Sequence, residues 1–264
     1  MRQFPILYLC VLSIALLADQ CKLSAENPYL PLVQGKWAHQ PTPVVENGLP
    51  FWLYGNGKMR RGRRYPLVVV LHGRRNKVAP GAEFKVQGIA TAWSKDAVQK
   101  SNPCFVFQPY YPPKSGWEKI PESLDASIDD LVKRLPVDPS RIYLFGFSNG
   151  GQGTFKALAR HPDRFAAAVT VSGPVPVKSV VGKIKTPLWC WVGENDHDTD
   201  KVGRVKKLAH ALQDAGAPVK LNVVPNAGHA CHAKATGNPK VHQWLFSQVL
   251  PSPNSKSTKK SAKQ

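Results

Sequence analysis

The stretch that decides the fold is RIYLFGFSNGG, residues 141–151. It begins with a short apolar run, Ile142–Phe145, of the kind that forms buried strands, and it leads into Gln152–Arg160, which is compatible with a helix. Between the two stands G-F-S-N-G, with Ser148 at its centre. A strand that turns sharply into a helix at such a serine is a nucleophile elbow, whose glycines avoid collisions at the turn. An ordinary glycine-rich turn or a phosphate cradle is the alternative interpretation.

Short apolar runs alternate with amphipathic stretches along the rest of the chain. We expect buried strands at Leu67–Leu71, Phe105–Gln108, Ile142–Phe145, Phe165–Val171, Leu188–Val192 and Leu221–Val224. Apolar residues at helical spacing predict helices over 124–135 and 202–212, and a closing helix over Val241–Leu250. Lys36–Tyr54 is expected to form an antiparallel ribbon first. The alternation predicts a single-domain α/β fold: a doubly wound, mostly parallel sheet with helices on both faces.

Composition supports one globular domain between two terminal segments. The chain has 264 residues, of which 42% are hydrophobic and 20% charged, which suits a sizeable core. We expect a signal peptide over residues 1–25, the α/β domain over residues 26–250 and a disordered basic tail over residues 251–264, where Ser, Lys and Pro dominate.

The first residues have the pattern of an export signal. Arg2 supplies a positive start, and Phe4–Ala18 is an uncharged run that is long for a signal peptide and short for a membrane span. Cleavage after Ala25 or after Ala18 fits the small residues there. The sequence therefore predicts a secreted or periplasmic protein, and membrane attachment only if the segment stays uncleaved as an anchor.

Cleavage after Ala25 leaves three cysteines, Cys104, Cys190 and Cys231. Because an exported protein meets an oxidising compartment, one disulfide and one buried thiol is the simplest expectation, with the pair unassigned. The cysteine spacings resemble neither a zinc motif nor a redox motif. We expect no metal and no cofactor.

A serine nucleophile requires a histidine base and an acid that orients this base, in the chain order serine, acid, histidine. Asp196 follows the predicted strand Leu188–Val192, and His229 follows the predicted strand Leu221–Val224. Since the carboxyl ends of parallel strands meet at one edge of a sheet, Ser148, Asp196 and His229 are expected to form a catalytic triad there.

Other acids and histidines lie near the two candidates. The acid loop also carries Glu194, Asp198 and Asp200, and His197 and His232 are close in sequence. Asp198 and Asp200 fit a solvated loop or a helix cap better, so Asp196 is favoured by its position at the strand end. His229 is favoured over His232 for the same reason.

Acyl transfer also requires donors for the oxyanion of the tetrahedral intermediate. The backbone N–H of Arg74, in the turn after Leu71-His72-Gly73, is predicted to converge with that of Asn149, the residue after the nucleophile. The His72 ring is expected to brace this loop.

In its motifs and their order along the sequence, the chain resembles secreted α/β-hydrolase esterases. These are grouped with dienelactone hydrolases, feruloyl and acetyl esterases, and peptidases related to prolyl oligopeptidase. The resemblance runs over residues 36–250 and is most specific in VDPSRIYLFGFSNGGQGTFKALARHPDRFAAAVTVSG, Val137–Gly173. It implies the same triad and oxyanion donors. The chain departs from the family in its basic loop HGRRNKVAPG and in GHACHAK, so the acyl and alcohol parts of a substrate are not implied.

The sequence therefore favours a serine hydrolase that cleaves carboxylic esters through an acyl-enzyme. A serine peptidase acting on small peptides and a catalytically silent binding module are the alternatives. The net charge of +19 is the one feature that suggests a nucleic-acid partner. Because no nucleic-acid-binding motif accompanies it, we expect no such partner. Arg74 and Arg75 instead suggest an anionic substrate, such as an ester on an acidic polysaccharide, with Arg75 as a substrate-binding residue.

Overall fold

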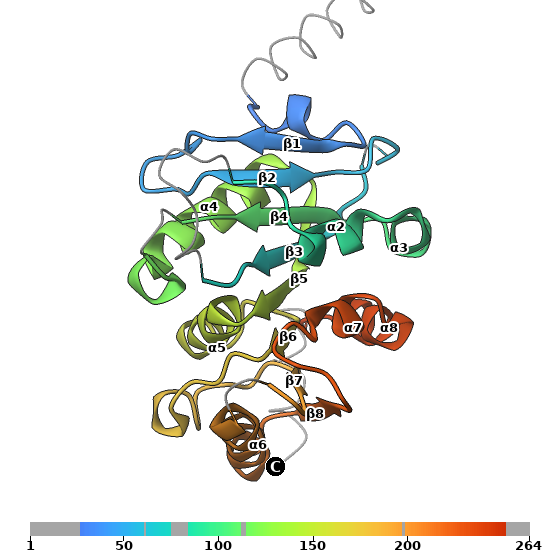
Figure 1. The fold of residues 1–264 in the computed structure, drawn as a ribbon. Helices are drawn as coiled ribbons and strands as arrows, with labels where there is room; N and C mark the ends of the chain where they lie inside the picture. The colour runs from blue at the N-terminus through green and yellow to red at the C-terminus, as the bar shows by residue number, and fades with distance from the viewer. Residues whose placement is uncertain (1–26, 61, 75–83, 112–114, 197–198, 252–264) are drawn as a thin grey trace, which may run out of the picture.

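The computed structural model describes residues 27–60, 62–74, 84–111, 115–196 and 199–251. Its centre is an eight-stranded sheet in the order β1-β2-β4-β3-β5-β6-β7-β8 (Figure 1). The strands are β1 (Trp37–Gln40), β2 (Phe51–Tyr54), β3 (Tyr65–Leu71), β4 (Phe105–Pro109), β5 (Val137–Phe147), β6 (Ala167–Val171), β7 (Leu188–Gly193) and β8 (Val219–Val224). The pairs β1–β2 and β2–β4 are antiparallel, and the remaining pairs are parallel.

The predicted strands and the antiparallel ribbon are confirmed, with shifts at their ends. The longest shift is in β5, which begins at Val137 rather than Ile142. Val137 pairs with Tyr65 at the start of β3, and the register shifts between Tyr65 and Leu67. Polar residues follow Val137, so the apolar run alone marks only the buried second half of this strand.

Helices cover both faces of the sheet, as the doubly wound fold requires (Figure 1). One core contains buried residues of α4 (Pro121–Arg134), α5 (Asn149–Arg160) and α6 (Thr199–Asp214). The opposite core contains buried residues of α2 (Gly88–Thr91), α3 (Asp96–Ser101), α7 (His232–Thr236) and α8 (Pro239–Ser247). Short 3₁₀ segments complete the described elements: η1 (Leu30–Leu32), η2 (Ala92–Ser94), η3 (Trp117–Lys119) and η4 (Val177–Ser179). The two cores bury the sheet on both sides.

The closing helix is shorter than predicted. It ends at Ser247, because Gln248 takes an extended backbone, and Leu250 then donates its N–H to the carbonyl of Ser140 in β5. Val241 and Leu245 are its buried residues, one turn apart. The apolar pattern therefore located the helix but not its end.

The prediction of a disulfide is wrong. Cys104, Cys190 and Cys231 are all buried free thiols. Cys190 lies in the core on the α6 side, whereas the other two lie on the opposite face of the sheet. Those two are also far apart, because Cys104 precedes β4 at its amino end and Cys231 follows β8 at the carboxyl edge. Burial raises the pKa of Cys104 and of Cys190 to about 12, which keeps both protonated.

The predicted signal peptide and nearly all of the predicted tail lie outside the described residues. Within the residues that the structure describes, no helix is both long and apolar enough to cross a membrane.

Candidate active site

Three of the predicted site residues follow three parallel strands at the same edge of the sheet. Ser148 comes directly after β5, Asp196 lies just beyond β7, and His229 lies beyond β8. Carboxyl ends of parallel strands face the same way, so loops that follow strands of one sheet converge. The topology thus brings residues that are up to 81 positions apart to one place.

Ser148 occupies the turn between β5 and α5 in a strained conformation. Its φ of 54° and ψ of −117° lie outside the regions that residues with a side chain ordinarily adopt. The turn is tight enough to require glycine at position 150, where a Cβ atom would lie 1.9 Å from the carbonyl oxygen of Leu71. At position 146 a Cβ atom would lie 2.2 Å from the carbonyl oxygen of Gly150. The two glycines of the sequence pattern are therefore explained by backbone contacts.

A chain of hydrogen bonds joins the three side chains. Ser148 Oγ lies 3.0 Å from His229 Nε2. On the other side of the ring, His229 Nδ1 lies 3.0 Å from Asp196 Oδ2 and 3.2 Å from Oδ1. A neutral ring that donates its Nδ1–H to the carboxylate presents the lone pair of Nε2 to the hydroxyl.

The Asp196 carboxylate is buried but held ionised. Its side chain has no exposed surface, and Lys201 Nζ lies 3.7 Å from Oδ1. Burial raises its pKa, but the hydrogen bond and charge of His229, the charge of Lys201 and a hydrogen bond from Ser172 outweigh burial and lower the pKa below the usual range. The carboxylate is therefore ionised at neutral pH beside the imidazole.

The other acids and histidines near Asp196 and His229 make different contacts. The His232 ring packs on Phe147 with ring centroids 4.3 Å apart, and burial followed by the charge of His229 lowers its pKa. Glu194 accepts the backbone N–H of Asn226 at 3.0 Å, and Asp200 is exposed near the start of α6. His197 and Asp198 lie outside the described residues.

Of the two predicted oxyanion donors, Asn149 directly follows Ser148. Asn149 is the first residue of α5, and the first N–H groups of a helix have no partner within the helix. Gly73 lies on the other side, where an added Cβ atom would be 3.5 Å from Cβ of Ser148. Arg74 directly follows Gly73 in the chain, so its N–H stays a predicted donor.

Aromatic side chains support this backbone. His72 is buried between Tyr111 and Trp117, with ring centroids 4.5 and 5.0 Å away, which fits the bracing role expected for it. Trp117 Nε1 donates to the carbonyl of His72 at 2.9 Å, and the Tyr111 hydroxyl donates to Asn149 Oδ1 at 2.8 Å. These bonds link the loop after β3 to the start of α5.

The charge around Arg74 is partly balanced. Its side chain is exposed. Burial raises the pKa of the nearby Glu118 carboxyl, but hydrogen bonds from its own backbone and from Asn149, with the charges of Lys156 and then Arg74, outweigh burial and lower that pKa. Arg75, predicted to bind substrate, lies outside the described residues. No group of three or more metal-ligating side chains occurs among the residues described.

Comparison with known proteins shows which family the chain belongs to. The model of the dienelactone hydrolase family matches residues 111–260, more than half of the chain and all three residues of the hydrogen-bonded chain. The chain belongs to the dienelactone hydrolase family. The predicted resemblance and the α/β-hydrolase fold are thereby confirmed.

Individual relatives of this dienelactone hydrolase family member are esterases and peptidases by name. The chain is 28% identical over 131 residues to the candidate esterase NocK of Nocardia uniformis subsp. tsuyamanensis, covering 42% of this chain and 33% of NocK. It is 27% identical over 223 residues to the acylamino-acid-releasing enzyme of Arabidopsis thaliana, covering 64% of this chain and 28% of that enzyme. The structure of a thermostable esterase has a TM-score of 0.70 and 27% identity, covering 83% of this chain and 64% of the esterase. The chain thus spans about a third or less of the curated relatives it matches.

Sequence reasoning missed several residues around the site of this family member. Ser172 directly follows β6 at the carboxyl edge, has a φ of 52° and hydrogen-bonds Asp196, so its place after a predicted strand was an available signal. Trp117 and Tyr111 belong to the loop after β4 and carry no periodic signal. Lys201, in the first turn of α6, was also missed, although its Nζ lies 3.7 Å from Asp196 Oδ1.

Proposed function

We propose that this member of the dienelactone hydrolase family is a serine hydrolase that cleaves carboxylic esters through an acyl-enzyme. The observation that carries the proposal is the hydrogen-bonded chain from Ser148 Oγ through His229 to the buried carboxylate of Asp196. The elbow presents this hydroxyl next to two backbone segments that can stabilise an oxyanion.

In the proposed acylation step, Ser148 Oγ attacks the carbonyl carbon of the ester while His229 Nε2 takes the hydroxyl proton. The N–H groups of Asn149 and Arg74 stabilise the negative oxygen of the tetrahedral intermediate. Asp196 holds the ring orientation and stabilises the imidazolium, which its low pKa permits. When the intermediate collapses, the bond to the alcohol oxygen breaks and His229 donates its proton to that oxygen.

Deacylation repeats the sequence with water as the nucleophile. His229 accepts a proton from water, the resulting hydroxide attacks the acyl carbon, and the same N–H groups stabilise the second oxyanion. Ser148 then leaves as the alkoxide and regains the proton from His229. The products are a carboxylic acid and an alcohol, and the side chains return to their starting protonation states.

Cleavage of small peptides is the second candidate, because the likeness to the Arabidopsis enzyme covers 64% of this chain. The likeness to a thermostable esterase covers more, at 83%. We expect a higher kcat/KM for aryl and alkyl esters than for an anilide or dipeptide with the same acyl group. Steady-state kinetics on a matched panel from acetyl to long-chain and feruloyl esters decides this. A higher kcat/KM for the amides would identify a peptidase instead.

Replacing Asp196 with Asn should lower kcat by about 10³- to 10⁴-fold, because an amide holds the imidazole in the wrong tautomer and supplies no charge. Asp200→Asn provides the matched control, since Asp200 is exposed in the same segment and should leave kcat within about twofold. Single-turnover kinetics with an aryl acetate would measure both variants. The assignment of the acid is wrong if Asp200→Asn is the more damaging change.

We also propose, from the sequence alone, that residues 1–25 direct export and are removed. Mass spectrometry of protein recovered from the native host would identify the first residue of the mature chain. An anionic substrate likewise remains a prediction that depends on Arg75 and on the exposed Arg74.

A further inference from the structure

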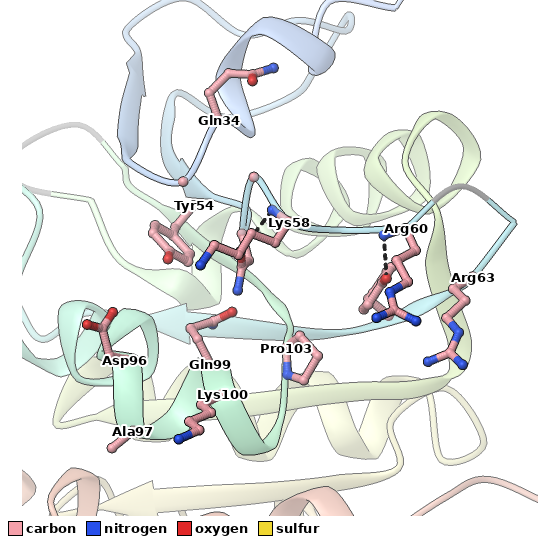
Figure 2. Close-up of a pocket in the computed structure, with 14 residues that line it drawn as sticks. Gln34, Tyr54, Lys58, Arg60, Arg63, Asp96, Ala97, Gln99, Lys100 and Pro103 are labelled. Carbon is pink, nitrogen blue, oxygen red and sulfur yellow. Dashed lines mark hydrogen bonds between the residues drawn. The ribbon is translucent and has the colours of Figure 1, made fainter.

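A large open cleft lies apart from the candidate active site, and Figure 2 shows the residues that line it. Its volume is about 920 Å³, in the range of cavities that enclose a drug-sized ligand. Tyr65, at the start of β3, and Pro103, just before β4, line it, so it sits at the amino ends of these parallel strands. The active-site loops follow the carboxyl ends. Along β3 from Tyr65 to Leu71 the two ends are about 20 Å apart.

The cleft carries an excess of positive charge. Lys58, Arg60, Arg63 and Lys100 line it, and Figure 2 shows them on two sides, three from the segment before β3 and one from α3. All four are exposed, and none forms an ion pair with another described residue. Asp96 is the acid among the lining residues. The lining therefore attracts anions.

The segment that carries three of these cations is fixed to the fold. The N–H of Arg60 donates to the Tyr65 hydroxyl at 2.7 Å, which ties the segment to the core, and the N–H of Lys58 makes a local bond to Asn56 Oδ1 at 3.0 Å. Tyr65 itself is buried in the core, with 7% of its surface exposed. The cationic side chains thus extend from an anchored backbone, which reduces the entropy lost on binding.

The cleft continues into a second hollow of about 180 Å³. The two share Arg63, Tyr65 and Pro103, and the second adds Arg64 and Arg141. Arg64 Nη1 donates to the neutral carbonyl of Val137 at 3.0 Å and keeps its full charge, whereas Arg141 pairs with Asp138 at 2.7 Å, which partly balances its charge. The two adjoining hollows are called the groove below, and cations line both of them, which suits a polyanion better than an anion with a single charge.

The other lining groups favour a sugar polymer over nucleic acid. Single-stranded nucleic acid is held by aromatic rings that stack on its bases. Tyr54 and Tyr65 are only 8% and 7% exposed, so their faces are not open to a base. The exposed Gln34 and the half-buried Asn56 instead offer amide donors and acceptors that match hydroxyl groups.

We propose that this groove is a second binding site, for an anionic polysaccharide whose carboxylate or sulfate groups contact Lys58, Arg60, Arg63 and Lys100. Its distance from Ser148 makes it separate from the groups that would react with an ester. The site gives the cations that precede β3, Lys58, Arg60 and Arg63, a role that the proposed triad does not.

The test measures binding of the full chain to polygalacturonate, to dextran sulfate, to neutral dextran and to a single-stranded DNA oligonucleotide at low salt. The cleft variant combines Lys58→Gln, Arg60→Gln, Arg63→Gln and Lys100→Gln. The control variant combines Lys178→Gln, Lys185→Gln, Lys206→Gln and Lys207→Gln, which removes the same charge from exposed lysines around η4 and α6. Thermal melting checks that both variants fold, and Lys58→Gln with Lys100→Gln replaces the cleft variant if it does not.

We expect the cleft variant to bind one or both anionic polysaccharides about tenfold more weakly or worse, and the control variant to change this affinity by less than about twofold. The preferred polymer then identifies carboxylate or sulfate as the recognised group. Equal losses in both variants, equal binding of neutral dextran, or tighter binding of DNA that depends on the cleft would each overturn the proposal. The readout does not use ester hydrolysis, so its failure leaves the proposed reaction untouched.

Discussion

Replacement of His229 by alanine should lower kcat on an aryl acetate by about 10⁵-fold or more, with the fold intact. The proposed reaction uses this imidazole in every proton transfer, and single losses in such triads remove nearly all of the triad's contribution. Its ring is partly exposed and joins Ser148 and Asp196 through Nε2 and Nδ1, so the substitution removes both contacts together.

Two histidine controls make the result specific. His210→Ala changes an exposed histidine of α6 and should leave kcat within about twofold. His232→Ala removes a ring that packs on Phe147, so a smaller loss of activity accompanied by a lower Tm is expected. A loss for His232→Ala equal to that for His229→Ala, with unchanged Tm, would mean that the base has been misassigned.

Replacement of Gly150 by alanine should have the largest effect on stability. The new Cβ atom would lie 1.9 Å from the carbonyl oxygen of Leu71, at the end of β3, and 2.7 Å from that of His72, both of them backbone atoms. Since α5 packs against the sheet at this point, the collision separates the helix from β3. We expect a loss of about 4 kcal/mol or more, a fall in Tm of about 10 °C, and the loss of ester turnover.

Gly203→Ala is the matched control in a helix. A Cβ atom at position 203 meets nothing within 4 Å, and alanine is the better helix former, so Tm should stay the same or rise slightly. Differential scanning calorimetry of both variants makes the comparison. An unchanged Tm for Gly150→Ala would show that the elbow is looser than the structure has it.

The sequence predicted the parts of the fold that rest on local patterns. Val68, Val69 and Val70 are fully buried on both faces of the sheet, and a strand of that kind appears as a continuous apolar run. The position of Asp196 and His229 after two such runs was enough to predict that they meet Ser148 at one edge. Parallel topology determines that edge without any knowledge of the loops between.

Long-range contacts without a local pattern could not be predicted. The bond from Trp117 to the carbonyl of His72 joins residues 45 positions apart, and neither has a periodic context. The disulfide was predicted from an assumed compartment, whereas the positions of Cys104, Cys190 and Cys231 depend on which face and which end of the sheet each one occupies. Helices of four to six residues, such as α2 and α7, are too short to show a helical period.

Covalent labelling of Ser148 tests the central proposal most directly. A fluorophosphonate reacts with serine hydroxyls that an adjacent base has activated, so the native chain should be labelled rapidly, and peptide mapping should locate the adduct on Ser148. Ser148→Ala should abolish labelling and His229→Ala should reduce it strongly, while both variants melt near the native Tm. Labelling that persists in Ser148→Ala, or a native chain that is not labelled although it hydrolyses esters, would contradict the account.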